Sequence, residues 1–157
     1  MIKVNFQQLS KFISDLPSKN LFRQWIKASL APEIKNGEIC MRFVDETEMA
    51  GLNQNFRKKS GPTNILSFPP PSSQEFDPDH LGDLVVCVPV VLQEAAAQHK
   101  SIVNHFAHLT VHGVLHLQGY DHIAEEDAIV MEDLEITILK ALNIPNPYLI
   151  LERSNES

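Results

Sequence analysis

The stretch SIVNHFAHLTVHGVLHLQGYDH, residues 101–122, decides how this chain is organised. Ser101 is a typical N-cap residue, and Gly119 is typical of the position just past the end of a helix. Apolar residues occupy nearly every side of the helix between them, which is the pattern of a helix buried within a domain. We therefore expect a long central helix that runs from Ser101 to about Leu117.

Four histidines form one stripe along this helix, three or four residues apart: His105, His108, His112 and His116. Imidazole rings on a buried face need hydrogen bonds or a metal ion. His112 and His116 have the spacing of two zinc ligands on a helix, and a turn at Gly119 can bring His122 back to them. Three protein ligands leave the fourth tetrahedral position to water or substrate, as in catalytic zinc sites. For His105 and His108 we favour ordinary core hydrogen bonding, or support of a ligand or the cleft wall.

The order of histidines and glycine matches the metzincin pattern H-E-x-x-H-x-x-G-x-x-H except at Gly113. Metzincins carry a glutamate there as general base, so their route to peptide hydrolysis lacks its proton acceptor in this chain. A bound metal could still lower the pKa of water and polarise an oxygen. Glycine within a helix costs up to ~1 kcal/mol relative to alanine, so we expect another segment to approach the Gly113 backbone closely.

The other segments predict an α+β fold with about four strands and five or six helices around the central helix. We expect strands at residues 2–6, 38–44, 64–68 and 84–88, and helices over 17–30, after Asp45, over 90–98 and over 125–142, with a proline-rich loop at 69–80. The prediction is one domain with a mixed sheet over residues 1–153, followed by a disordered tail at 154–157.

The last helix is expected to be amphipathic. Its acidic residues, including Glu132 and Glu135, are predicted on the solvent side. The predicted buried side comprises Ile129, Leu134, Ile138 and Leu142.

Composition narrows the class of protein. The chain has 157 residues, 43% hydrophobic and 21% charged, near the averages of globular domains. No apolar run approaches the ~20 residues of a membrane-spanning helix, and no secretory signal is apparent. Cys40 and Cys87 are expected to be buried free thiols in a reducing cytoplasm. The net charge of −7 repels nucleic acid, so RNA binding would need a local basic patch or a partner.

Longer motifs resemble a known family. Residues 112–122 read HGVLHLQGYDH, the complete signature H-G-x-L-H-L-x-G-Y-D-H of the bacterial YbeY family of rRNA-maturation endoribonucleases. The family patterns L-N-x-x-[YF]-R and P-T-[DN]-[VI]-L-S-F occur as LNQNFR at 52–57 and PTNILSF at 62–68, and L-G-D stands at 81–83. The resemblance covers nearly the whole chain in order.

The resemblance implies a zincin-like single domain with one Zn²⁺ per chain held by His112, His116 and His122. It implies a cytoplasmic, metal-dependent endoribonuclease that prefers single-stranded RNA and acts in 16S rRNA 3′-end maturation, rRNA processing and ribosome quality control. The expected partners are rRNA and the small ribosomal subunit, with ribosome-assembly proteins as further candidates, and neither a membrane nor DNA. The family's functional arginine falls on Arg57, whose guanidinium can bind phosphate bidentately.

Two points stay open on the residues alone. Asp121 could orient a ligand ring or take a proton, or it could simply form the turn after Gly119 and Tyr120. Two other functions also remain as alternatives: a metallohydrolase of another substrate, and a non-enzymatic ribosome-assembly factor with a structural zinc ion.

Overall fold

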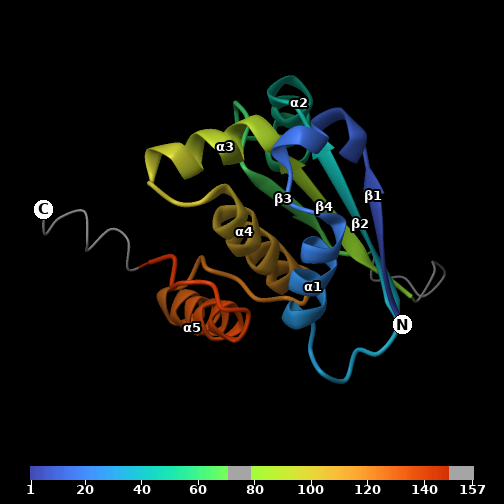
Figure 1. The fold of residues 1–157 in the computed structure, drawn as a ribbon, viewed down its shortest axis with the longest axis vertical. Helices are drawn as coiled ribbons and strands as arrows, with labels where there is room; N and C mark the ends of the chain where they lie inside the picture. Colours follow the sequence, from blue (N-terminus) through green and yellow to red (C-terminus); the bar gives the residue numbers. More distant parts are fainter. Residues whose placement is uncertain (71–78, 149–157) are drawn as a thin grey trace, which may run out of the picture.

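The computed structural model describes residues 1–70 and 79–148. Within these ranges the elements are β1 (Ile2–Gln7), a 3-10 helix η1 (Leu9–Asp15), α1 (Lys19–Ser29), β2 (Gly37–Val44), α2 (Glu46–Arg57), β3 (Ile65–Phe68), β4 (His80–Cys87), α3 (Val88–Ala97), α4 (Ile102–Leu117) and α5 (Glu125–Ala141) (Figure 1). The predicted α+β class, the four strands and the number of helices are confirmed. The predicted tail at 154–157 and most of the predicted loop at 69–80 lie outside the described residues.

The four strands form one mixed sheet in the order β1-β2-β4-β3. β2 is parallel to both β1 and β4, whereas β3 is antiparallel to β4 at the edge. Helix α4 packs against this sheet, and α1 and α5 contact α4 in turn (Figure 1). This arrangement places α4 at the centre of the molecule, as its apolar surface predicts.

Side chains alternate between the two faces of the sheet. Ile39, Met41 and Phe43 of β2 belong to the large core that includes α1 and α4. Val44, on the other face, joins a smaller apolar cluster with Met49 of α2. The two faces are therefore covered by different helices.

The helices and strands differ from the sequence predictions in three respects. β4 begins at His80 rather than at residue 84, because its first residues pair with the backbone of β2. The 3-10 helix η1 is not apparent from hydrophobic spacing, and none of its residues is buried. Ile129 is 54% exposed, so the inward face of α5 is rotated away from it.

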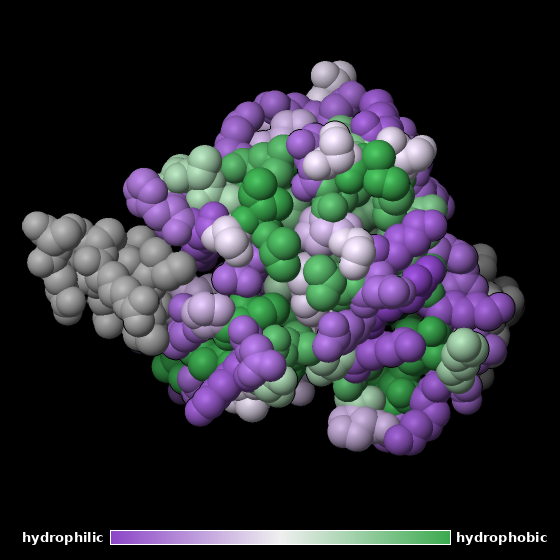
Figure 2. Space-filling model, viewed as in Figure 1, coloured by the Kyte–Doolittle hydropathy of each residue, from purple (hydrophilic) through white to green (hydrophobic). Residues whose placement is uncertain are grey.

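No helix in the described part of the chain is both long and apolar enough to cross a membrane. On the face seen in Figure 2, hydrophobic residues lie between hydrophilic ones and do not form one continuous apolar surface.

Candidate metal centre

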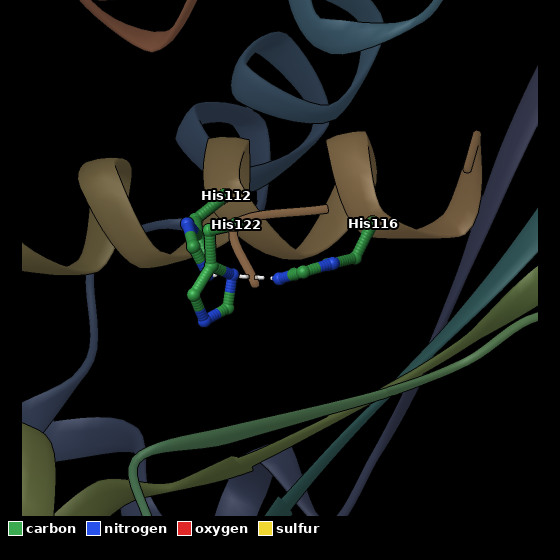
Figure 3. A group of neighbouring side chains, drawn as sticks. All are labelled: His112, His116 and His122. Carbon is green, nitrogen blue, oxygen red and sulfur yellow. Dashed lines mark hydrogen bonds between the residues drawn. The ribbon is translucent and has the colours of Figure 1, made fainter. Parts of the chain in front are cut away.

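The end of α4 brings three histidines together. His112 and His116 project from the same side of α4. Gly119 has a φ of +98°, a conformation that favours glycine, and the backbone there closes the helix by hydrogen bonds to the carbonyls of Leu115 and His116. The chain then reverses, and His122 points its ring back toward the other two (Figure 3).

The three rings have the spacing of a metal site. Their ring centroids are 4.6 Å (His112–His116), 5.0 Å (His116–His122) and 5.3 Å (His112–His122) apart. The Nε2 atoms of His112 and His116 are separated by 3.1 Å, and one nitrogen of each ring lies within 4.8 Å of the others. Two nitrogens bound to one tetrahedral zinc ion at about 2.0–2.1 Å would be about 3.3 Å apart. The donor set therefore fits a single ion with little rearrangement.

Glu135 of α5 sets the orientation of His112. Its Oε1 lies 2.9 Å from Nδ1 of His112. An ionised carboxylate can only accept, so His112 donates through Nδ1, and Nε2 is the ring atom that would bind a metal. Burial alone would raise the pKa of Glu135, but the hydrogen bonds from His108 and His112 outweigh it and lower the pKa to about 2. Glu135 is thus ionised at neutral pH.

His116 is also in the protonation state that binds metal. Burial lowers its pKa below the usual value for histidine, and the neighbouring charges of His112 and His122 lower it further. The neutral imidazole is the ligand form. Burial likewise raises the pKa of Tyr148 above its ordinary value, with a further contribution from the Glu135 charge, so Tyr148 keeps its proton and donates it to Glu135 at 2.9 Å.

The location of Glu135 contradicts the predicted solvent position. Its exposed fraction is 0%, and it accepts hydrogen bonds from His112 and from Tyr148. The physical reason is that the inward face of α5 meets the histidine face of α4. A carboxylate there accepts hydrogen bonds from the imidazoles, which an apolar side chain cannot do. A sequence signal exists: Glu135 stands midway between Met131 and Leu139, four residues from each, on what is otherwise the buried apolar stripe.

The other two histidines of α4 do not join the cluster. His105 is buried and its Nε2 lies 3.0 Å from Oε1 of Glu94 in α3. His108 lies 3.4 Å from both Glu135 and the Tyr148 hydroxyl. Both histidines therefore pair with carboxylates, and His108 borders the Glu135 network.

The three histidines open into a pocket of ≈ 790 Å³, which also contains the predicted site residues Arg57 and Asp121. Arg57 is the last residue of α2, and Lys59 lines the same pocket. The Oδ1 atom of Asp121 accepts hydrogen bonds from the backbone N–H groups of His122 (2.6 Å) and Ile123 (3.2 Å). Asp121 therefore does form a turn, and that turn places His122.

Gly113 faces the sheet, as its unfavourable helix propensity suggested. A Cβ at this position would lie 2.8 Å from Cδ1 of Ile65 and 2.9 Å from Cδ2 of Leu84. The Ser67 hydroxyl donates to the Gly113 carbonyl at 3.1 Å. The position of the metzincin glutamate is thus packed against β3 and β4, and a side chain there would have to displace Ile65 and Leu84.

Comparison with known proteins agrees with this geometry. A family model described as "Endoribonuclease YbeY" matches residues 3–143. The chain belongs to the YbeY family. This confirms the resemblance in the motifs and the prediction of an endoribonuclease.

Three relatives described as Endoribonuclease YbeY illustrate the extent of the similarity. The protein from Nitrosomonas europaea is 49% identical over 137 residues, 87% of this chain and 79% of that one. Those from Coxiella burnetii and Methylococcus capsulatus are 45% and 49% identical, each over 94% of this chain and over 99% and 96% of their own lengths. The solution structure of TM1509 from Thermotoga maritima matches with a TM-score of 0.52 and 25% identity, covering 91% of this chain and 92% of that one.

Proposed function

We propose that this member of the YbeY family is a zinc-dependent endoribonuclease that cleaves single-stranded RNA, with one ion held by His112, His116 and His122. The observation that carries the proposal is the convergence of three imidazole donors in a pocket that also contains Arg57. Zinc, when bound there, would act as a Lewis acid and lower the pKa of water.

The chain's own residues would bind the phosphate. Cleavage places negative charge on the non-bridging oxygens, and fixed cations stabilise that charge. Arg57 and Lys59 line the same pocket as the histidines and supply positive charge in a chain whose net charge is −7. The planar guanidinium of Arg57 is suited to two oxygens of one phosphate.

An exposed aromatic ring supports the proposed preference for single strands. Phe56 is 64% exposed at the rim of this pocket and is held edge-on against Phe68, with ring centroids 5.4 Å apart. Unpaired bases stack on such rings, whereas paired bases in a duplex are not available for it. One face of Phe56 would hold a base next to the phosphate bound by Arg57.

Asp121 has a supporting role in the proposal. Its Oδ1 holds the turn that presents His122, and its position on the pocket wall suits a carboxylate that takes up a proton during cleavage. Peptide hydrolysis, the alternative reaction, is disfavoured because Gly113 faces the sheet and not the pocket.

Residues 1–153 would act as one catalytic domain in the cytoplasm, on rRNA of the small ribosomal subunit and in 16S rRNA 3′-end maturation. The negative net charge disfavours strong binding of free RNA and suits delivery of the substrate by the subunit or by assembly proteins.

The test combines metal analysis with RNA cleavage. Wild type, His116→Ala and Arg57→Ala are purified free of other nucleases and given 16S rRNA precursor within small subunits. We expect His116→Ala to lose zinc from the three-histidine site and activity, and Arg57→Ala to keep zinc but lose at least about tenfold in rate. Lys27→Ala, a basic residue in the last turn of α1, is the control. If zinc-loaded wild type leaves the RNA intact, the enzymatic proposal is wrong. If a folded metal-free variant supports rRNA maturation in cells, the assembly-factor alternative replaces it.

A further inference from the structure

A second group of metal-binding side chains lies outside the three-histidine site. One donor atom from each of Cys40, His80 and Asp83 lies within 4.8 Å of the others. Cys40 is on β2, and the other two are on β4. Cys40 and Asp83 stand on the sheet face opposite to Met41 and Leu84, which point into the α4 core. This cluster is therefore on the other side of the sheet from α4 and its histidines.

The backbone pairing brings two of the three donors together. Cys40 is the register partner of Asp83 between parallel strands, so their side chains are neighbours on one face. Asn5 of β1 is the partner of Cys40 on its other side. A thiol, a carboxylate and an amide thus form one row across three strands.

An irregularity in the pairing adds the third donor. Residues three apart in a regular strand point to opposite faces. Here Glu38 pairs with His80 and Ile39 with Gly82, so Leu81 is an extra residue in β4. The bulge turns His80 onto the face of Asp83, and His80 Nε2 lies 3.4 Å from Asp83 Oδ2.

The bulge is a specific feature of the packing. Gly82 has a φ of +138°, which favours glycine. A Cβ there would lie 2.6 Å from Cδ2 of Leu117 at the end of α4. Glycine is therefore needed at this position. Leu117, on the α4 side of the sheet, packs against the backbone of the bulge that orients His80.

The cluster is accessible and chemically suited to a cation. The side chains of His80 and Asp83 are 29% and 45% exposed, and Cys40 and Asp83 border a pocket of ≈ 350 Å³. Burial raises the pKa of the Cys40 thiol, and the Asp83 charge raises it further. Without a cation the thiol therefore keeps its proton.

We propose that Cys40, His80 and Asp83 form a second site for a divalent transition-metal ion, with Zn²⁺ as the ion that best matches thiolate, imidazole and carboxylate donors. Binding replaces the thiol proton of Cys40, which passes to solvent, and leaves one tetrahedral position for water. The ion links the first residue of β4 to the middle of β2. Its role is to stabilise this end of the sheet, and it is independent of RNA cleavage.

Cobalt(II) distinguishes the two sites because only one contains sulfur. Cobalt is titrated into reduced, metal-free wild type, His116→Ala and Cys40→Ser, and the absorption spectrum is recorded. We expect two equivalents to bind to wild type and one to each variant. A thiolate-to-cobalt charge-transfer band in the near ultraviolet should be present in wild type and His116→Ala and absent in Cys40→Ser. In a further variant, His80→Gln, the apparent affinity for cobalt read from this band should fall at least tenfold.

Several results would overturn the inference. There are two such results: wild type binds a single equivalent and shows no charge-transfer band, or the band survives in Cys40→Ser. Added zinc should also raise the unfolding temperature of folded His116→Ala but not of the double variant with Cys40→Ser. RNA cleavage should be unchanged in Cys40→Ser, so failure of this proposal and failure of the proposed function give different results.

Discussion

Replacing Glu135 with glutamine should weaken metal binding at the three-histidine site without unfolding the protein. The carboxylate is fully buried, and its Oε1 is 2.9 Å from Nδ1 of His112. Glutamine keeps the shape and one acceptor oxygen but removes the charge that makes His112 a better ligand. Losing such a partner typically costs about 10–100-fold in metal affinity, or roughly 1.4–2.7 kcal/mol.

For Glu135→Gln we expect a loss in zinc affinity near the tenfold end of that range, because the amide oxygen can still accept a hydrogen bond from His112. Glu135→Ala should fall near the hundredfold end, since His112, His108 and Tyr148 would all lose their acceptor. Unpaired buried groups cost about 1–3 kcal/mol each, so Glu135→Ala should also unfold at lower urea concentration.

The assay is a zinc competition titration against a chromophoric chelator. All variants carry Cys40→Ser, so that only the three-histidine site is measured. Glu132→Gln is the matched control, since it makes the same change one turn earlier on the exposed side of α5. A folded Glu135→Gln protein that binds zinc as tightly as the Glu132→Gln control would refute the argument that Glu135 orients His112.

Three further outcomes are expected from the geometry. Gly113→Ala should lower the free energy of unfolding by about 1–2 kcal/mol, because overpacking against β3 and β4 exceeds the gain in helix propensity, whereas Gly51→Ala, with nothing within 4 Å, should be neutral or stabilising in the same urea titration. Phe56→Ala should raise KM for single-stranded RNA about tenfold with less change in kcat, and Phe56→Trp should restore it; equal KM values in all three proteins would exclude base stacking. Glu94→Gln should cost about 1 kcal/mol at pH 7, because the hydrogen bonds of Glu94 to His105 and Asn64 outweigh burial and lower its pKa. A carboxylate with a lowered pKa stabilises the fold above the pKa of the unfolded chain, about 4.3. This stabilisation is lost as the pH falls through the lower pKa of Glu94 in the folded protein, so the difference in stability between the two proteins should shrink over that range.

Much of the fold follows from local sequence rules. The caps at Asp45 and Ser101 mark helix starts that the structure confirms through their hydrogen bonds to backbone N–H groups. The glycine at position 119 ends α4, and the apolar surface of that helix predicts its central place. These features depend on residues a few positions apart, so they can be predicted from the local sequence without knowledge of the tertiary structure. The histidine spacing likewise predicts two of the three donors directly, since one turn of helix sets their distance.

Long-range contacts decided the rest. Glu135 lies 23 residues after His112, and nothing local shows that the inward face of α5 meets imidazoles instead of apolar side chains. His80 and Cys40 show no pattern in the sequence that predicts a site. A bulge in β4, at which Leu117 packs against Gly82, turns His80 toward Asp83. Arg57 reaches the pocket because α2 ends beside the segment after α4. Spacing along the chain determines which residues share a face of a helix or strand. Which faces meet depends on the packing of elements that are distant in sequence, and this packing brings the residues of each candidate site together.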